Sequence, residues 1–501
     1  MKFVPTLDEV NQLAQEEKFH IVPISCEILS DLCTPIQALN YFKHAGEVCF
    51  LLESVAAHER WGRYTFLGWQ PSLEITCREG VMKVGDKQIS TSDPNKHIRE
   101  LLKDYKAPRF HFLPSFTGGL VGYFAYDYLT YAEPTAKVNH QVKEHFNDID
   151  LMLFDKVIAF DHLKQKIVLI VNIKLSKDGK EQAKLYEQAI AKLKEISEGL
   201  HKVAQVPLSK VSKETKAQAP LLDKIEFLFS KEQYCSMVEK AQRYIHEGDI
   251  FQIVLSNKLS VPFEGSLLNT YRILRTTNPS PYMFFFSSNK IEVAGASPET
   301  LVKLQDGIVH TFPLAGTRPR GHNEQEDERL AFELLHDEKE LAEHNMLVDL
   351  GRNDIGKICS FGSVKVTKLH SIERYSHVMH IGSTVSGEIA PHCDALDAIA
   401  AVLPAGTLSG APKIRACQLI GQLEGVERGI YGGAFGYIDF TGNMDMCIAI
   451  RLAYLLDGKV HVRSGAGIVA DSIGQNEYQE CINKAKAVIN ALTMAQDNEE
   501  L

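Results

Sequence analysis

Short apolar runs alternate with polar segments through the first third of the chain and predict strands. These runs cover residues 47–54, 60–68, 151–158 and 167–173, and the last two are predicted to pair as neighbours. A basic, Ala-rich pattern with helical period follows at residues 177–196 and predicts an amphipathic helix. Strands mixed with helices in this way predict an α+β fold.

A polar stretch without periodicity, residues 201–220, is the best candidate for a linker. We therefore predict an N-terminal α+β region over residues 1–215 and a second region over residues 221–495. Past the linker, residues 231–247 predict an amphipathic helix, and residues 250–256 predict the strand that follows it.

Three glycines, Gly118, Gly119 and Gly122, open an aromatic segment that runs to Tyr128. Glycine inside a strand pattern marks a turn or a place where another backbone comes close. We expect one of these two roles here.

Composition indicates a globular protein with a sizeable core. The 501 residues are 45% hydrophobic and 24% charged, and the net charge of -10 argues against a nucleic-acid partner. We predict no membrane span, because no apolar run approaches about 18 residues. The N-terminus lacks the apolar centre of a signal peptide, and the ten cysteines form no C-x-x-C pair, so we expect a cytoplasmic protein with reduced thiols.

Two segments place pairs of carboxylates on helices. Glu340 and Glu343 lie three residues apart in KELAEHNMLVDLGRND and so share one face, and Glu477 and Glu480 repeat the spacing ahead of Lys484. Four converging carboxylates repel one another unless a cation neutralises them, and oxygen ligands suit Mg²⁺ or Mn²⁺. We predict that the two helices clamp one metal that holds an anionic substrate. The alternative is that both pairs belong to solvated faces.

Two further patterns match known sites only in part. Residues 351–357 fit the start of a phosphate-binding loop, but Ile358 stands where Ser or Thr must hold Mg²⁺, and the segment follows a predicted helix. His377 and His380 have no accompanying Cys cluster or H-E-x-x-H motif. Neither ATP nor zinc is therefore expected.

Seven segments in the second region resemble, in order and spacing, the chorismate-utilising enzymes, and among them the anthranilate synthase family. These segments are PLAGTRPRG, DEKELAEHNMLVDLGRND, RYSHVMH, GTLSGAPK, YGGAFGY, IAIR and SGAGIVADS. The likeness is strong over residues 231–491 and extends into the N-terminal region through LLES and RYTFLG. It implies a large α+β fold with two stacked sheets in a helix, sheet, sheet, helix arrangement, in which both regions pack intimately.

The resemblance implies a Mg²⁺-dependent lyase that starts tryptophan biosynthesis. Ammonia would add to chorismate, the ring hydroxyl would leave, and loss of pyruvate would give anthranilate. Chorismate carries two carboxylates and a poor leaving group, so the reaction needs neutralised charge, a proton donor and exclusion of water. The resemblance implies that Glu343 and Glu480 bind the metal, with Glu340 and Glu477 as direct or water-bridged ligands, and that the metal holds the ring carboxylate.

The resemblance also assigns the remaining pocket residues. Tyr431 and Arg451 would hold the pyruvyl carboxylate, Arg451 through a bidentate fork. The catalytic set would comprise His380 as acid or base, Glu340 as proton donor to the hydroxyl, and Thr407 in the pocket wall. Further substrate contacts would come from Gly316, Thr317, Gly465, Ala466, Gly467 and Lys484.

Two positions bear on the incoming nucleophile. Enzymes that resemble aminodeoxychorismate synthase carry a lysine where this chain has Ala315, and isochorismate synthases carry a water-activating lysine where it has Gln252. With neither lysine present, ammonia is favoured, and these two activities are the alternatives. A non-catalytic regulatory relative is disfavoured, because all four glutamates and Arg451 are present.

A partner and an inhibitor also follow from the resemblance. None of the cysteines lies on the glycine-rich elbow of a glutaminase, so a separate glutamine amidotransferase subunit is expected to supply ammonia in a heterodimer or heterotetramer. LLES and NPSPYM resemble the two halves of an L-tryptophan feedback site. Its residues would be Glu53, Ser54, Pro281, Tyr282 and Met283. The alternative is a buried strand end and a rigid turn.

Overall fold

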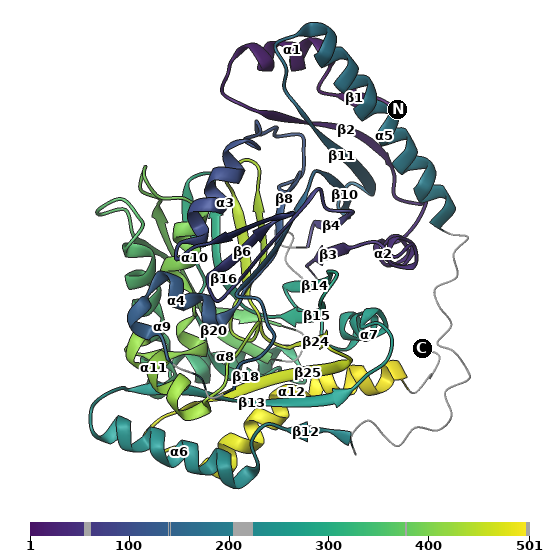
Figure 1. Cartoon of the computed structure of the whole chain (residues 1–501). Coiled ribbons are helices and arrows are strands. Elements are labelled where there is room, and N and C mark those ends of the chain that lie inside the picture. The colour runs from purple at the N-terminus through teal and green to yellow at the C-terminus, as the bar shows by residue number, and fades with distance from the viewer. Residues whose placement is uncertain (55–61, 139, 141, 204–223, 376–377, 497–501) are drawn as a thin grey trace.

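The computed structural model describes residues 1–54, 62–138, 140, 142–203, 224–375 and 378–496 (Figure 1). Its strands form two large sheets. The 13-stranded sheet has the order β1 (Phe3–Val4), β2 (Ile21–Leu29), β11 (Lys166–Lys174), β10 (Lys156–Asp161), β4 (Tyr64–Trp69), β3 (Cys49–Glu53), β14 (Tyr282–Ser287), β15 (Glu292–Ser297), β24 (Leu452–Leu456), β25 (Lys459–Ile468), β13 (Gln252–Pro262) and β12 (Glu226–Phe227), with β21 (Gly410–Ala411) beside β13.

The 12-stranded sheet has the order β18 (Leu314–Pro319), β20 (Val378–Glu388), β17 (Ile308–Thr311), β16 (Thr300–Gln305), β23 (Met444–Ile448), β22 (Ala434–Asp439), β8 (Gly119–Phe124), β9 (Ile149–Phe154), β5 (Leu73–Arg78), β6 (Val81–Val84) and β7 (Lys87–Ser90), with β19 (Lys365–Arg374) beside β20. Neighbouring strands in both sheets are antiparallel.

Helices cover the outer faces of both sheets. Those on the 13-stranded sheet are α1 (Leu7–Gln15), α2 (Pro35–His44), α5 (Gly179–Val203), α7 (Leu268–Thr277) and α12 (Gly474–Gln496). Those on the 12-stranded sheet are α3 (Pro94–Lys103), α8 (Glu324–Leu335), α9 (Glu338–Gly356) and α10 (Ala395–Val402). A further group packs over β13 and β25: α4 (Leu129–Ala132), α6 (Lys231–His246) and α11 (Lys413–Glu424). Short 3₁₀ turns are η1 (Tyr126–Tyr128), η2 (Pro134–Ala136) and η4 (Gly406–Leu408).

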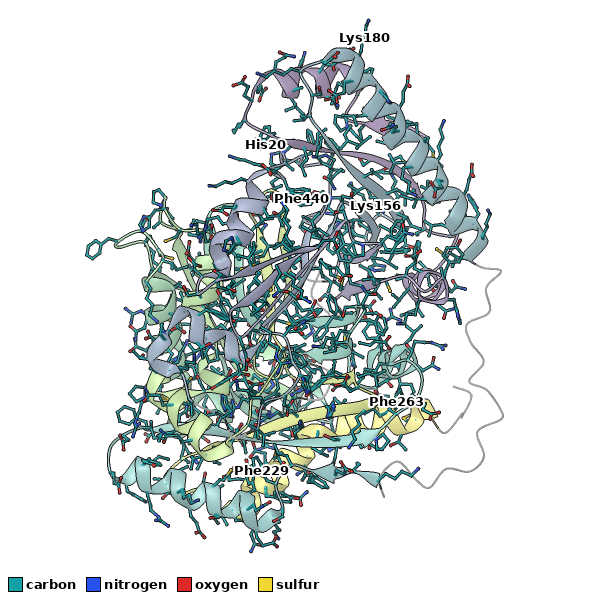
Figure 2. The ribbon with its side chains drawn as sticks, in the orientation of Figure 1. His20, Lys156, Lys180, Phe229, Phe263 and Phe440 are labelled. Atoms are coloured by element: carbon teal, nitrogen blue, oxygen red, sulfur yellow. The ribbon has the colours of Figure 1, made fainter. Side chains whose placement is uncertain are left out.

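Aromatic side chains fill the space between the two sheets, and Figure 2 shows side chains packed through this interior. Successive residues of β14 face opposite sides, as a strand requires. Met283 and Phe285 join the core under the helices, whereas Phe284 joins the core between the sheets. Phe284 stacks on Phe435 of the other sheet, with ring centroids 4.1 Å apart. The expected helix, sheet, sheet, helix arrangement is confirmed.

Both sheets contain strands from both halves of the chain. β3 pairs with β14, and β8 pairs with β22, so the two regions are intimately packed, as the resemblance implied. The boundaries at 215 and 221 stay a prediction. Of the expected linker, residues 201–203 end α5, and residues 204–220 lie outside the described residues.

The run that we predicted as one strand over residues 151–158 is two strands in different sheets, which is a correction. β9 ends at Phe154 and β10 begins at Lys156, with Asp155 between them. Both strands are buried, so their apolar pattern continues across the break. The expected pairing with residues 167–173 is confirmed for β10, which pairs with β11.

The predicted helices agree well with the structure. The helix expected at residues 177–196 is α5, which extends to Val203, and the one expected at residues 231–247 is α6. Residues 351–356 form the end of α9, so this segment is not a loop that could wrap a phosphate. Within the described part of the chain, none of the helices is both long and apolar enough to cross a membrane.

Two of the points at which the chain crosses between the sheets are adjacent. One crossing joins β15 to β16 through Glu299, and the other joins β23 to β24 through Arg451. The Ile448 N–H donates to the Glu299 carbonyl (3.0 Å), and the Ala296 N–H donates to the Arg451 carbonyl (3.1 Å). These hydrogen bonds hold the two crossings side by side.

Gly119 and Gly122 allow β8 to lie close to its neighbours, which confirms the role expected for glycines here. A Cβ on Gly122 would lie 2.0 Å from the Asp150 carbonyl oxygen, and its φ of +151° is rarely adopted by other residues.

Gly122→Ala should therefore lower the free energy of unfolding by about 2–4 kcal/mol, because added backbone strain and overpacking combine. Urea unfolding measures this change. Gly199→Ala is the matched control, because Gly199 lies in α5 with open space around it. That variant should be neutral or more stable by up to about 1 kcal/mol. An equal loss of unfolding free energy in both variants would contradict the role of Gly122 in close backbone packing.

Candidate active site

Three of the predicted site residues, Thr407, Arg451 and Lys484, lie around Glu299 at one of these adjacent crossings. The Thr407 hydroxyl, in η4, donates to a Glu299 carboxylate oxygen at 3.1 Å. The positive charges of Arg451 and Lys484 both act on the same carboxyl. Residues from both crossings, α12 and η4 are thus brought together, although they are far apart in the sequence.

His380 is held in one tautomer by the backbone of β18. Its Nδ1 lies 2.8 Å from the Gly316 carbonyl oxygen, which can only accept, so Nδ1 carries the proton. The Thr317 hydroxyl lies 3.1 Å from the same nitrogen. Burial lowers the pKa of His380, and the charge of Arg451 lowers it further. The neutral ring therefore has an unprotonated Nε2 that can act as a base.

Gly316 lies between His380 and the helix of glutamates. The register of β18 against β20 shifts between Ala315 and Thr317, and Gly316 has a φ of +66°. A Cβ on Gly316 would lie 3.1 Å from a Glu340 carboxylate oxygen. A glycine here therefore lets α9 approach the strand that orients His380.

The two pairs of glutamates on α9 and α12 act on one another electrostatically. The pKa of Glu343 is raised by burial and by the neighbouring charges of Glu340 and Glu480. The pKa of Glu477 is likewise raised by burial and by Glu480. Lys484 forms an ion pair with Glu480 at 2.7 Å. The charges of Glu343 on α9 and Glu480 on α12 therefore influence one another.

The glutamates do not form a closed ligand cluster. Among the residues that the structure describes, no group of three His, Cys, Asp or Glu side chains could hold a metal ion. The ion pair between Arg318 and Glu340, at 3.5 Å, directs that carboxylate partly toward β18. The four-ligand metal site therefore stays a prediction.

Tyr431, the glycines of β25 and Lys484 form a second part of the site. A Cβ on Gly465 would lie 2.9 Å from the Tyr431 hydroxyl oxygen. The Lys484 ammonium donates to the Gly465 carbonyl at 3.1 Å. Burial raises the pKa of Tyr431, so its hydroxyl keeps its proton and can donate to an anion. Ala466 and Gly467 continue the same strand.

Glu299 is a site residue to which the sequence analysis gave no role. Burial raises its pKa to about 7, against the opposing effects of Thr407, Arg451 and Lys484. Nothing in the segment GASPE indicates that its glutamate meets a threonine 108 residues further on. Arg451 is also unusual, because its φ of +51° is a left-handed conformation that side-chain-bearing residues rarely adopt.

The two halves of the predicted tryptophan site lie on paired strands. Met283 is opposite Glu53 in the register of β14 and β3. The Glu53 carboxylate accepts hydrogen bonds from the Tyr271 hydroxyl (2.5 Å) and from Arg275 (Nη2, 2.9 Å). Neither α7 residue was expected from the sequence.

The side chains of the other predicted members of the tryptophan site, Ser54, Pro281 and Tyr282, have different surroundings. The Ser54 hydroxyl oxygen is buried and has no hydrogen-bond partner among the described residues. The Tyr282 hydroxyl donates to Asp445 of the 12-stranded sheet at 2.7 Å, and so faces the space between the sheets. Pro281 immediately precedes β14. The tryptophan-binding role of these residues stays a prediction.

The chain is similar to known proteins over nearly its whole length. The family model for chorismate binding enzymes matches residues 47–490. Anthranilate synthase component 1 of Acetivibrio thermocellus is 43% identical over 98% of this chain and 99% of its own length. The corresponding protein of Aquifex aeolicus (strain VF5) is also 43% identical, over 99% of both chains.

Solved structures match as well. The crystal structure of anthranilate synthase component I from Streptococcus pneumoniae TIGR4 superposes with a TM-score of 0.73 and 37% identity, covering 92% of this chain and 99% of that one. MenF, the menaquinone-specific isochorismate synthase from Escherichia coli, gives a TM-score of 0.69 at 18% identity over 97% of this chain and 98% of its own, which is a likeness of fold alone.

The raised pKa of Glu299 predicts how stability depends on pH. As the pH rises from about 4.5 to 7, glutamate in the unfolded chain is ionised while Glu299 in the folded chain retains its proton, so this group's contribution to stability falls. Glu299→Gln stays neutral and removes that fall. The melting temperature of the variant relative to wild type should therefore increase between pH 5 and pH 8 in scanning calorimetry. The exposed Glu328→Gln should give a constant difference, and a constant difference for Glu299→Gln would refute the assignment.

Proposed function

Because the chain belongs to the chorismate-binding enzyme family, in its anthranilate synthase component 1 branch, we propose that it converts chorismate and ammonia to anthranilate and pyruvate with Mg²⁺. The observation that carries this function is the contact of Thr407 with Glu299 beside Arg451 and Lys484. Glu299 can donate a proton, and the two cationic side chains suit chorismate, which is a dianion. His380 adds a neutral base with a fixed tautomer.

The substrate would be held at both of its carboxylates. Arg451 and Tyr431 would bind the pyruvyl carboxylate, and Lys484 adds positive charge beside Gly465. The glycines of β25 let the substrate approach the backbone closely, because they carry no Cβ. Thr317 and Gly316 would form the opposite wall around His380.

The donor set on α9 and α12 fits Mg²⁺. All four side chains offer oxygen ligands, and the pKa values of Glu343 and Glu477 are raised by burial and, to a lesser extent, by neighbouring carboxylates whose repulsion a cation would relieve. Mg²⁺ commonly uses one or two protein carboxylates and completes its shell with water and substrate. We assign Glu343 and Glu480 as its ligands, with Glu340 and Glu477 direct or water-bridged. The bound ion would supply the charge that holds the ring carboxylate.

Glu299 is better placed than Glu340 to protonate the departing hydroxyl. A carboxyl with a pKa of about 7 is partly protonated at neutral pH, as a general acid must be. Glu340 is instead paired with Arg318. In the second stage, Nε2 of His380 would take the ring proton as the bond to the enolpyruvyl oxygen breaks, which aromatises the ring and releases pyruvate.

Ammonia as the nucleophile is supported by two positions that lack an amine. Gln252 begins β13, and Ala315 lies on β18 beside Gly316. A lysine at either position would favour the isochorismate or aminodeoxychorismate alternative. The relatives are named as component 1, which implies a second component, and we propose a glutamine amidotransferase subunit that supplies ammonia.

We further propose that L-tryptophan inhibits the enzyme at the junction of β3 and β14. The unpartnered, buried hydroxyl of Ser54 is available to a ligand, and Glu53 is fixed beside it by Arg275. Met283 lies opposite Glu53 in the register of β14 and β3 and would supply the apolar contacts for an indole ring.

The purified chain should produce anthranilate fluorescence from chorismate, Mg²⁺ and an ammonium salt, and chelation should abolish it reversibly. Glu343→Gln should raise the Mg²⁺ concentration for half-maximal activity at least tenfold, because one charged ligand is lost. Glu338→Gln, on the exposed side of the same helix, is the matched control and should leave that concentration unchanged. A different product from wild type would overturn the function, and equal Mg²⁺ requirements would overturn the ligand assignment.

Ser54→Ala should raise the L-tryptophan concentration for half-inhibition at least tenfold and leave the uninhibited rate unchanged, because the hydroxyl serves the inhibitor and not the substrate. Inhibition curves for anthranilate formation measure the effect. Ser90→Ala, an exposed serine at the end of β7, should behave as wild type. If wild type neither binds tryptophan nor responds to it, the feedback site is ruled out.

A further inference from the structure

Arg428 is a charged side chain in the interior, with 1% of its surface exposed. Its Nε and Nη2 donate to the two carboxylate oxygens of Glu424, at 3.0 and 2.5 Å. Its Nη1 donates to the Leu408 carbonyl, and its Nη2 also donates to the Val254 carbonyl, both at 2.7 Å. All three nitrogens of this buried guanidinium therefore donate hydrogen bonds to groups of the protein.

The partners of Arg428 adjoin residues of the candidate active site. Leu408 follows Thr407 in η4, and Val254 lies opposite Gly467 in the register of β13 and β25. The guanidinium carbon also lies 5.8 Å from the ring centroid of Tyr431. One guanidinium therefore touches three segments that carry or flank pocket residues.

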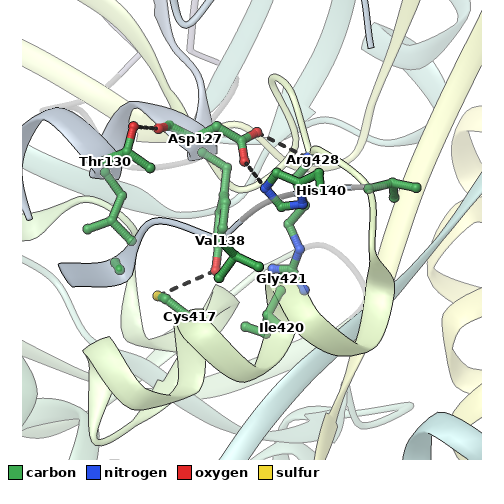
Figure 3. A pocket seen from close by; sticks show the side chains of 12 residues that line it. Asp127, Thr130, Val138, His140, Cys417, Ile420, Gly421 and Arg428 are labelled. Atoms are coloured by element: carbon green, nitrogen blue, oxygen red, sulfur yellow. Dashed lines mark hydrogen bonds and ion pairs between the residues drawn. The ribbon is translucent and has the colours of Figure 1, made fainter. Parts of the chain in front are cut away.

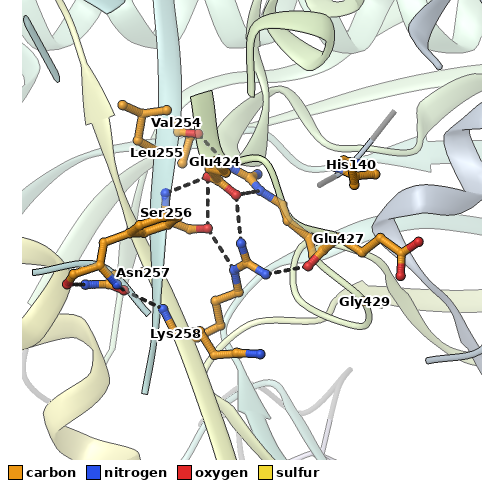
Figure 4. A network of polar contacts seen from close by, with 12 residues as sticks. His140, Val254, Leu255, Ser256, Asn257, Lys258, Glu424, Glu427 and Gly429 are labelled. Atoms are coloured by element: carbon orange, nitrogen blue, oxygen red, sulfur yellow. Dashed lines mark hydrogen bonds and ion pairs between the residues drawn. The ribbon is translucent and has the colours of Figure 1, made fainter. Parts of the chain in front are cut away.

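Glu424 extends these connections to the glycines of β25, and Figure 4 shows it at the centre of the polar network. Its carboxylate accepts from the Ser256 N–H at 2.8 Å and from Arg463 Nη2 at 2.8 Å. Ser256 lies opposite Gly465, and Arg463 is two residues before it. The network therefore holds β13 against β25 at the point where the glycines face the site.

The backbone of Arg428 is anchored from the other side. The N–H groups of Arg428 and Gly429 both donate to one oxygen of Asp127, at 3.0 Å. Asp127 and His140 line a small cavity together with Arg428, in which the Asp127 carboxylate and His140 Nε2 are 3.6 Å apart (Figure 3). Both the side chain and the main chain of Arg428 are thus fixed.

We propose that Arg428 is a positioning residue: acting from behind the pocket, its guanidinium sets the spacing between Thr407, Tyr431 and the glycine strand. These groups come from three separate segments, and small displacements of binding groups weaken substrate recognition and catalysis. This inference rests on the proposed function, because it assigns those three groups to chorismate.

Lysine could not perform this role. Arginine presents five N–H donors in a rigid plane, whereas lysine has three donors on one atom and no plane to lie near a tyrosine ring. In Arg428→Lys, the fork to Glu424 is lost, and Leu408 or Val254 is left without its donor. In Arg428→Met, the charge is removed, but Glu424 still pairs with Arg463.

The test is the steady-state kinetics of Arg428→Lys and Arg428→Met in the intact chain, with ammonium as the nitrogen source. The KM for chorismate should rise at least tenfold in both variants, while the KM for ammonium changes less than twofold, because only the anion-binding segments shift. Arg63→Lys is the matched control, because Arg63 forms a bidentate pair with Asp161 that contacts none of these segments. It should lower the melting temperature and leave both KM values unchanged.

Two results would overturn the proposal. One is an unchanged KM for chorismate in a folded Arg428 variant, and the other is loss of folding in both variants, which would make the role purely structural. Failure of wild type to aminate chorismate would instead refute the proposed function, so the two failures are distinguishable.

Discussion

The hydrogen bonds between the two crossings of the chain are the constraint on which the site depends. Each crossing carries one charged residue, Glu299 or Arg451, and two backbone hydrogen bonds hold them together. A crossing is also where regular pairing ends, so side chains there are free to face a ligand while two sheets fix their positions. The left-handed backbone of Arg451 is retained because this surrounding structure determines it.

Burial then gives the fixed groups their chemistry. The same exclusion of water raises the pKa of Glu299 and lowers that of His380, so the candidate site contains a carboxyl that is partly protonated at neutral pH and an imidazole that is largely neutral. The positive charges of Arg451 and Lys484 oppose the rise in the pKa of Glu299. The charge of Arg451 also lowers the pKa of His380 further. In the proposed roles, Glu299 would donate one proton and His380 would accept another, which leaves the overall charge of the pocket unchanged.

Much of this architecture follows from sequence pattern. The helical period of the sequence predicted α5, α6 and α9. The layered fold was predicted from the seven family motifs, because so many motifs rarely occur in the same order by chance. The division of residues 151–158 between two sheets was not predictable, since buried strands have the same apolar pattern in either sheet. Glu299 and Arg428 were assigned no role for a related reason. Their significance comes from contacts with Thr407 and Leu408, which lie in another segment of the chain, and no pattern in the sequence predicts these contacts.

The shared sheets have a consequence for the newly synthesised protein. β8 ends at residue 124, and its partner β22 begins at residue 434. One edge of β8 therefore stays unpaired until late in translation. Exposed strand edges are prone to join other chains. Emergence from the ribosome is therefore a stage at which this strand edge is open to pairing with other chains.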